Sequence, residues 1–153
     1  MLSRRLPQVV TAVALLCGCT PLGLWIYQDP AVRVSRVRLD ANRSTRTPIL
    51  VALAVRNPND YELTAVRVEV QLRLDQVPVG LLDRDTVVTL ASDTVSTVTM
   101  PLLLATGTTS DHLRVFQSGT HSFLVEGRAT VTTPVGQRRI RFADAGDMRF
   151  EAH

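Results

Sequence analysis

The segment that decides the fold is 57-NPNDYELTAVRVEVQLRL-74, a polar turn that runs directly into an alternating stretch. In residues 66–74 every even position is apolar and every odd position is polar or charged. This alternation predicts a β-strand with one apolar face and one solvated face. Pro58 holds its own φ near about −65° and biases Asn57 toward an extended conformation, so the preceding residues predict a chain reversal.

Two roles are open for the asparagines of this turn. The side chains of Asn57 and Asn59 can bond to nearby backbone and fix how one strand passes to the next. They can alternatively present their amides to a ligand, as loop residues on a rigid scaffold often do. Local backbone bonding needs fewer assumptions, and we therefore interpret Asn57, Pro58 and Asn59 as a structural motif.

Short apolar or alternating runs on both sides of this segment predict further strands. Residues 32–39 change phase between Val34 and Val37, which indicates a bulge, and the run 49–55 is apolar on both faces, as in a central strand. Pro101 marks the run 95–104 as an edge strand or a bulged one. Further strands are expected at 86–90, 123–131 and 139–142 and around 148–150, with bends at 75–80 and a hairpin loop at 133–137.

One helix is expected, with Thr109 or Ser110 as its cap and Gly119 beyond its end. The pattern as a whole predicts an all-β fold, an antiparallel β-sandwich of about seven strands with one short helix.

The N-terminus has the features of a targeting segment. Arg4 and Arg5 precede an apolar run at 9–16, and Leu16-Cys17-Gly18-Cys19 resembles the lipobox of bacterial lipoprotein signal peptides. We therefore expect a signal peptide at 1–18, acylation of Cys19, a tether at 19–30 and one domain at 31–153. The alternative is an uncleaved membrane anchor, because apolar residues continue as far as Tyr27 and approach the ~20 residues that a spanning helix needs.

This leader predicts a cell-envelope protein held to a membrane by lipid. Thr20 follows the acylated cysteine where inner-membrane lipoproteins carry Asp, so in a host with two membranes we expect the periplasmic face of the outer membrane. Both cysteines lie in the N-terminal segment, which leaves the domain without a thiol for a disulfide, a metal cluster or nucleophilic catalysis.

Charge and motifs disfavour nucleic-acid binding, metal binding and catalysis. Without the signal peptide, 15 arginines face 14 acidic residues, and Arg67 and Arg73 alternate with acids instead of forming a basic stripe. The three histidines, His112, His121 and His153, do not have metal-ligand spacing. The carboxylate pairs Asp83 with Asp85 and Asp144 with Asp147 are expected in solvated loops. We expect no enzyme activity, no metal and no cofactor.

The chain resembles a known family at several of these motifs. The apolar strand that ends in Asn57-Pro58-Asn59, the alternating strand that leads to Val79-Gly80 and the run Val98-Thr99-Met100-Pro101 are similar to the late embryogenesis abundant type 2 family. Its domain is also called the water stress and hypersensitive response domain. The resemblance covers roughly residues 32–150. It implies an immunoglobulin-like or fibronectin-III-like sandwich, a link to desiccation and other stresses, and no fixed cofactor.

Two functions are therefore expected. The first is a non-enzymatic, membrane-tethered module that interacts with proteins or membranes in tolerance of desiccation or osmotic stress. The second is an envelope lipoprotein that binds or relays an apolar ligand or lipid between its two sheets.

Overall fold

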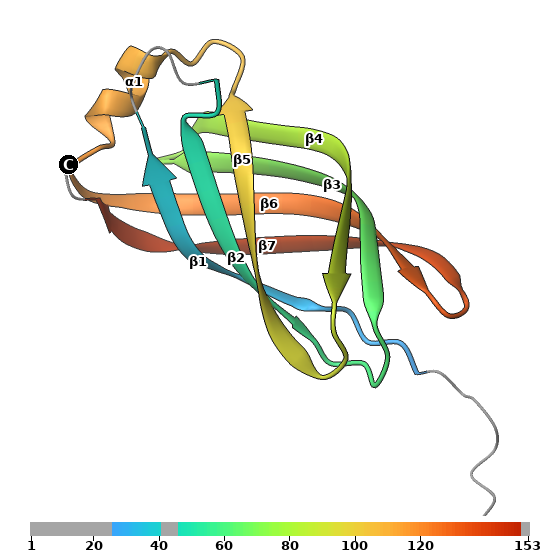
Figure 1. Cartoon of the computed structure of the whole chain (residues 1–153). Coiled ribbons are helices and arrows are strands. Elements are labelled where there is room, and N and C mark those ends of the chain that lie inside the picture. The colour runs from blue at the N-terminus through green and yellow to red at the C-terminus, as the bar shows by residue number, and fades with distance from the viewer. Residues whose placement is uncertain (1–25, 41–45, 151–153) are drawn as a thin grey trace, which may run out of the picture.

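The computed structural model describes residues 26–40 and 46–150 of the chain. It contains seven antiparallel strands and one short helix (Figure 1), which confirms the all-β fold expected from the sequence. In chain order the elements are β1 (Ala31–Leu39), β2 (Ile49–Asn57), β3 (Leu63–Leu74), β4 (Val77–Leu90), β5 (Thr94–Leu104), α1 (Ser110–Val115), β6 (Gly119–Thr133) and β7 (Gly136–Phe150).

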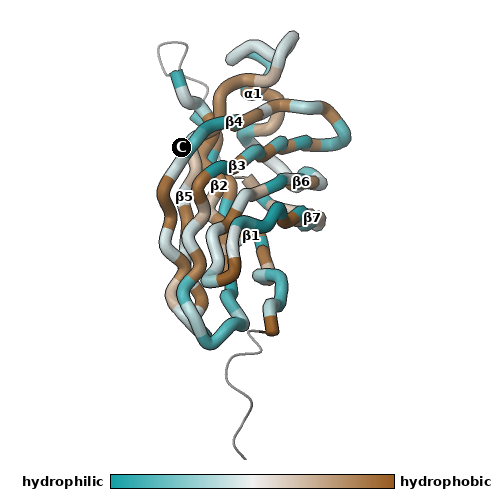
Figure 2. Tube along the Cα trace, turned by 90° about the vertical axis from the view of Figure 1, so that its right-hand side faces the viewer, coloured by the Kyte–Doolittle hydropathy of each residue, from teal (hydrophilic) through white to brown (hydrophobic). Residues whose placement is uncertain are grey.

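The strands form one sheet in the order β1-β2-β5-β4-β3-β6-β7, which curls around a single core. Strands β1, β2 and β5 make one layer, and β4, β3, β6 and β7 cross behind it (Figures 1 and 2). The two layers are joined where Gly80 pairs with Leu104 and Leu81 with Leu103. Beyond these pairs, residues 82–90 of β4 and 94–102 of β5 are not paired with each other, and we call this open stretch the β4–β5 seam.

Strand β3 has the two-faced character that its alternation predicts, with one local correction. Val68, Val70, Leu72 and Leu74 are buried in the core. Val66 was expected on the same face but is only half-buried, because the pairing of β3 with both of its neighbours shifts between Ala65 and Arg67. A bulge at this point changes the phase, so Ala65 and Leu63 supply the core on its N-terminal side.

Other strand predictions depended on local signals and are confirmed. The pairing of β1 with β2 is irregular between Val34 and Arg36, as the phase change predicted. Strand β2 lies between β1 and β5, as expected of a run that is apolar on both faces. Strand β5, which contains Pro101, has an unpaired edge along most of its length.

Strand β4 is longer than the sequence pattern indicated. A strand was expected only at 86–90, but β4 has 14 residues and begins directly after a turn at Asp75 and Gln76, both with positive φ. Pro78 is accommodated at an irregularity where Leu72 pairs with Gly80 and Arg73 with Pro78. The carboxylates that were expected in loops consequently lie on strands, Asp83 and Asp85 on β4 and Asp144 and Asp147 on β7.

The single described helix begins and ends as its sequence predicts. Thr109 is the N-cap of α1, and its hydroxyl accepts the backbone N–H of His112. Leu113 and Phe116 are buried, and Gly119 follows with a φ of +93°. No helix within residues 26–40 and 46–150 has the length and apolar character needed to cross a bilayer.

Candidate functional site

Asn57 lies at the end of β2 and is fully buried, with 0% of its surface exposed. Its Nδ2 donates to the carbonyl oxygens of Tyr61 at 2.8 Å, Leu90 at 3.1 Å and Ala91 at 3.2 Å. Its Oδ1 accepts the backbone N–H of Asn59 at 3.1 Å and the side-chain amide of Asn59 at 2.9 Å. One side chain thus ties the β2–β3 turn to the end of β4.

Asn59 extends this network to the incoming chain. Its Oδ1 accepts the N–H of Gln28 at 2.8 Å, and its Nδ2 donates to the carbonyl of Gln28 at 2.8 Å. Its own carbonyl accepts the N–H of Asp93, in the turn between β4 and β5, at 3.0 Å. Asn59 therefore joins three segments that are far apart in the sequence, and it is only 3% exposed.

Both amides of the motif have internal partners on their oxygen and their nitrogen atoms. Because the two side chains are buried as well, a ligand that approached from solvent would find no free amide group there. This geometry favours the structural interpretation of Asn57, Pro58 and Asn59.

Cys19, the expected lipidation site, and residues 1–25 lie outside the described part of the chain. The last residues of the expected tether contact the domain. Gln28 is bound by Asn59, and the guanidinium of Arg138 lies 4.6 Å from the centre of the Tyr27 ring. Burial, together with the nearby carboxylate of Asp29, raises the pKa of Tyr27 well above its usual range.

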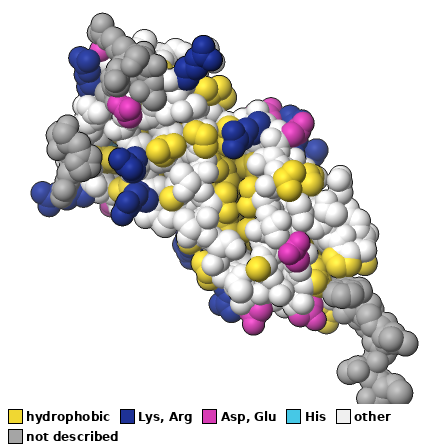
Figure 3. Space-filling view, in the orientation of Figure 1, with side chains coloured by type: hydrophobic (Ala, Val, Ile, Leu, Met, Phe, Trp, Pro, Cys, Tyr) yellow, Lys and Arg dark blue, Asp and Glu magenta, His cyan; other side chains and the backbone are white. Residues whose placement is uncertain are grey.

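The β4–β5 seam exposes the apolar interior between the two layers. A stripe of hydrophobic side chains is visible between β5 and the descending part of β4 (Figure 3). Below it lies a cavity of about 40 Å³, and every residue that lines it is apolar. The lining comes from both layers: Val32, Leu53, Val55, Ala65, Val68, Val88, Leu90, Val98, Met100, Ala129, Val131, Ile140 and Phe142.

A larger groove of about 740 Å³ runs over the outer face of β3, β4, β6 and β7. Its charged lining is of mixed sign, with Glu69, Asp83 and Glu126 beside Arg128 and Arg141. Next to it, Arg67 forms an ion pair with Asp83 at 2.8 Å and longer ones with Glu69 and Asp85. This mixture is typical of a solvated sheet face and does not select a ligand of one charge.

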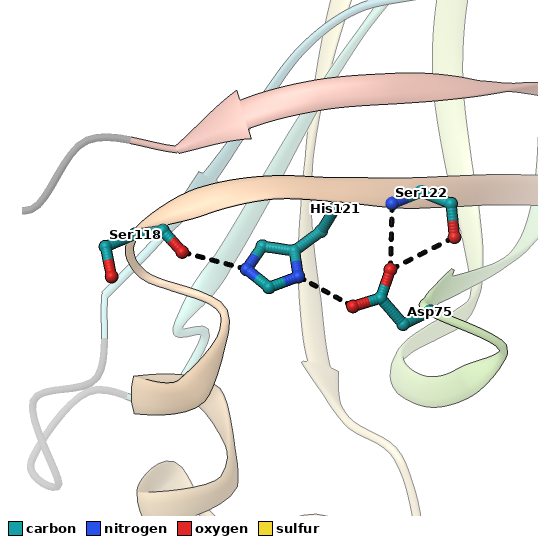
Figure 4. A network of polar contacts seen from close by, with 4 residues as sticks. All are labelled: Asp75, Ser118, His121 and Ser122. Atoms are coloured by element: carbon teal, nitrogen blue, oxygen red, sulfur yellow. Dashed lines mark hydrogen bonds and ion pairs between the residues drawn. The ribbon is translucent and has the colours of Figure 1, made fainter.

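A polar network lies at the end of β3 that is far from the Asn57–Asn59 turn. It connects Asp75, Ser118, His121 and Ser122 (Figure 4). His121 Nδ1 lies 2.6 Å from Asp75 Oδ2, and His121 Nε2 lies 2.9 Å from the carbonyl oxygen of Ser118. The other carboxylate oxygen of Asp75 accepts the N–H and the hydroxyl of Ser122. The ring also lies edge-to-face with Phe116, at 5.2 Å between the ring centres.

This network has the residue types of a serine hydrolase triad but not its geometry. A general base would need Nε2 free to accept a hydroxyl proton, whereas here Nε2 faces a backbone carbonyl that can only accept. Two acceptors at the two ring nitrogens favour the doubly protonated imidazolium. The hydrogen bonds to Asp75 and Ser118 accordingly raise the pKa of His121, and His121 and Ser122 lower the pKa of Asp75.

His121 stands just before the strand expected at 123–131, but the sequence does not identify its partner. Asp75 is 46 residues away, and nothing in the local pattern connects the two. The available sequence signal was the bend expected at 75–80, which begins at Asp75. Among the described residues, no three His, Cys, Asp or Glu side chains cluster closely enough to hold a metal ion.

One comparison with known proteins identifies a family. The family model described as "Late embryogenesis abundant protein" matches residues 52–146, which is more than half of the chain. No curated protein sequence gives a significant match.

Two solution structures resemble the fold. One, of a protein from Arabidopsis thaliana, has a TM-score of 0.60 at 12% identity and covers 91% of this chain and 95% of that one. The other, of a protein described as late embryogenesis abundant, has a TM-score of 0.54 at 15% identity and covers 81% of this chain and 72% of that one. At these identities the likeness concerns the fold alone.

Proposed function

The chain belongs to the late embryogenesis abundant protein family, and from this premise we propose that it is a non-enzymatic, membrane-tethered module of envelope stress tolerance. The observation that carries the proposal is the family match from β2 to β7. The specific identity of a water stress and hypersensitive response domain, with an immunoglobulin-like or fibronectin-III-like sandwich, is part of the same proposal. The separation of the strands into two crossing layers supports it.

The absence of an enzymatic role is also proposed, and three arrangements support it. His121 directs Nε2 at the carbonyl of Ser118, and the amides of Asn57 and Asn59 bond within the protein. The charged side chains of the outer groove pair across strands or face solvent with mixed sign. We therefore propose that the module acts by interacting with proteins or membrane surfaces.

The tether is proposed from the leader sequence. Acylation of Cys19 would fix the domain to the envelope, on the periplasmic face of the outer membrane in a host with two membranes. Contact of Gln28 with Asn59 supports a short link between anchor and domain, because the domain already binds the chain nine residues after Cys19. An uncleaved N-terminal anchor is the alternative form of the same proposal.

One experiment in the native host tests anchor and role together. A deletion strain carries the wild-type gene or Cys19→Ala, and both are labelled with a palmitate analogue, fractionated and dried. Wild type is expected to be labelled, to enter the membrane fraction and to restore survival after drying. Cys19→Ala is expected to lose the label, and Cys17→Ala, in the same leader, serves as the control that keeps it.

Each readout can contradict a separate part of the proposal. Labelling of Cys19→Ala would refute acylation at this residue. An unlabelled, uncleaved wild-type chain in the membrane fraction would support the signal anchor. Equal survival of the deletion strain and the wild type after drying and osmotic shock would refute the stress role.

A second candidate function is the binding or relay of an apolar ligand, and the β4–β5 seam favours it. The cavity beneath the seam is lined by apolar residues only, and the neighbouring strand edges are free to move apart because they are unpaired. At about 40 Å³ the cavity would have to widen to accept an acyl chain.

Native mass spectrometry of the protein purified from its host tests this candidate. A bound lipid is expected in the wild type, and it should be lost in Val98→Asp, which places a charge at the cavity wall. Asp83→Asn on the outer face is the matched control. A wild-type protein without any lipid adduct would refute the candidate.

A further inference from the structure

The β4–β5 seam has one paired end, and several contacts hold it together. Gly80 and Leu81 pair with Leu104 and Leu103. Directly beyond these pairs, the N–H of Ala105 donates to the carbonyl of Val79 at 3.0 Å, and the hydroxyl of Thr108 donates to the carbonyl of Pro78 at 2.8 Å. The start of β4 is thereby fastened to the segment between β5 and α1.

His121 adds a bridge across the same end. Asp75 belongs to the turn that leads into β4, whereas Ser118 follows α1, the helix reached from β5. The imidazole lies between them, with Nδ1 at Asp75 and Nε2 at the Ser118 carbonyl. Both arms need a proton on the ring nitrogen, so the imidazolium is the only protonation state of His121 that makes both bonds at once.

We propose that the His121 imidazolium is a pH-dependent clamp on the paired end of the β4–β5 seam. When the ring loses a proton, it keeps its bond to the Asp75 carboxylate and releases the Ser118 carbonyl. Asp75 remains held on β6 by Ser122, whose N–H and hydroxyl both reach its carboxylate. The bonds of Ala105 and Thr108 to the start of β4 remain, and the paired end loses one of its cross-links.

The direction of the pH effect follows from the two partners. The pKa of His121 is raised above its ordinary 6.5, so the clamp is complete below about 6.5 and is lost as pH rises through the raised value. The pKa of Asp75 is lowered from 3.8, so its contribution persists above 3.8 and is lost as pH falls through the lowered value. The side chains of His121 and Asp75 are 15% and 46% exposed, so solvent weakens the pair.

Other charges near the ring do not reproduce this effect. The raised pKa of His121 comes from Asp75 and Ser118, with burial acting in the opposite direction. The ring also touches the aromatic side chains of Phe116 and Phe150. Charged residues on the elements around it are Arg73 of β3, Asp111, His112 and Arg114 of α1, and Asp147 and Arg149 of β7.

Hydrogen exchange of the full chain tests the clamp. Protection factors, corrected for the intrinsic pH dependence of exchange, are measured at pH 5.5 and 8.5 for peptides that cover residues 77–81 and 102–105. In the wild type they are expected to be about fivefold lower at pH 8.5, the effect of losing one hydrogen bond of a partly exposed group. In His121→Gln they should be low at both pH values.

Two further variants make the test specific. Asp75→Asn keeps a residue that tolerates the positive φ of the turn, and it should remove the pH effect and return the His121 pKa toward 6.5 in an NMR titration. His112→Gln is the matched control, because Gln at this helix position maintains the capping box, and it should behave as wild type. Equal wild-type protection at both pH values, or the same decline in His121→Gln, would overturn the clamp.

The clamp needs no bound ligand, so its failure is distinguishable from failure of the proposed functions. If His121→Gln does not fold, the clamp is still tested by the wild type at the two pH values and by the Asp75→Asn variant. Lipid occupancy, read by native mass spectrometry on the same samples, reports separately on the apolar-ligand candidate.

Discussion

Asn57 shows how a single polar side chain can determine a junction. Its Nδ2 reaches carbonyls on two separate segments, and its Oδ1 fixes the conformation of Asn59 two residues later. A buried amide is tolerated because it has partners at both of its ends. The Asn-Pro-Asn sequence therefore combines a backbone restriction, through Pro58, with two side chains that replace missing backbone partners.

We predict that Asn57→Asp is strongly destabilising. The carboxylate would keep the size of the amide but lose the N–H groups that serve three carbonyls, and it would place a charge where nothing is exposed to water. The free energy of unfolding should fall by roughly 3 kcal/mol or more. Urea denaturation measures it, with Asp60→Asn, an exposed change in the same turn, expected within about 0.5 kcal/mol of wild type.

Pro58→Ala and Asn59→Ala should likewise lower thermal stability more than they alter any binding. The Asn59 change removes both bonds to Gln28 and one to Asn57. If stability held while membrane or partner binding vanished, the turn would be a binding site and the structural interpretation would be wrong.

Strands β1 and β7, the two edge strands of the sheet, lie next to each other, and a side chain of β7 bonds to β1. The carboxylate of Asp144 on β7 accepts the backbone N–H of Val34 at 2.7 Å and contacts the guanidinium of Arg33 at 3.2 Å. Val34 lies at the irregularity of β1, where the pairing with β2 shifts before Arg36. The bulge thus places a backbone donor opposite a strand that β1 does not pair with.

We predict that Asp144→Ala loosens β1 without unfolding the domain. The N–H of Val34 would lose its acceptor, and the loss of one charge-assisted bond should lower the free energy of unfolding by about 1–2 kcal/mol. Exchange of the Val34 amide should increase while that of β3 amides stays unchanged. Asp147→Ala, an exposed position on the same strand, is the control, and an unchanged Val34 amide in Asp144→Ala would contradict the prediction.

At the scale of the whole molecule, the sequence predicted the features that depend on a few neighbouring residues. The turn at Pro58, the bulge of β1, the cap at Thr109 and the free edge around Pro101 each follow from local backbone chemistry. The expected number of about seven strands followed from these signals together, although the runs at 139–142 and around 148–150 form one strand, β7. The predicted strand in β4 was too short. The charged residues of its outer face and Pro78 did not indicate a strand, although β4 pairs with β3 along its length.

Contacts between distant segments were not predictable in this way. Asp75 and His121 meet because β3 pairs with β6, and Asn59 and Gln28 meet beyond the pairing of β1 with β2. Asp144 and Val34 meet where the curled sheet brings β7 to β1. A single sequence contains no local pattern that relates such pairs. For the same reason the β4–β5 seam was unexpected: the length over which two neighbouring strands pair depends on the curvature of the sheet.

The bond between Gln28 and Asn59 makes the two ends of the domain different from each other. Asn59 also binds Asp93, so residues 26–30 lie beside the turn that joins β4 to β5, whereas the start of β6, which carries His121, lies at the far end (Figure 1). Val88, Leu90 and Val98, which line the apolar cavity, are all close in sequence to that turn. The apolar cavity therefore lies toward the end of the domain at which residues 26–30 enter it, and the His121 network lies toward the other end.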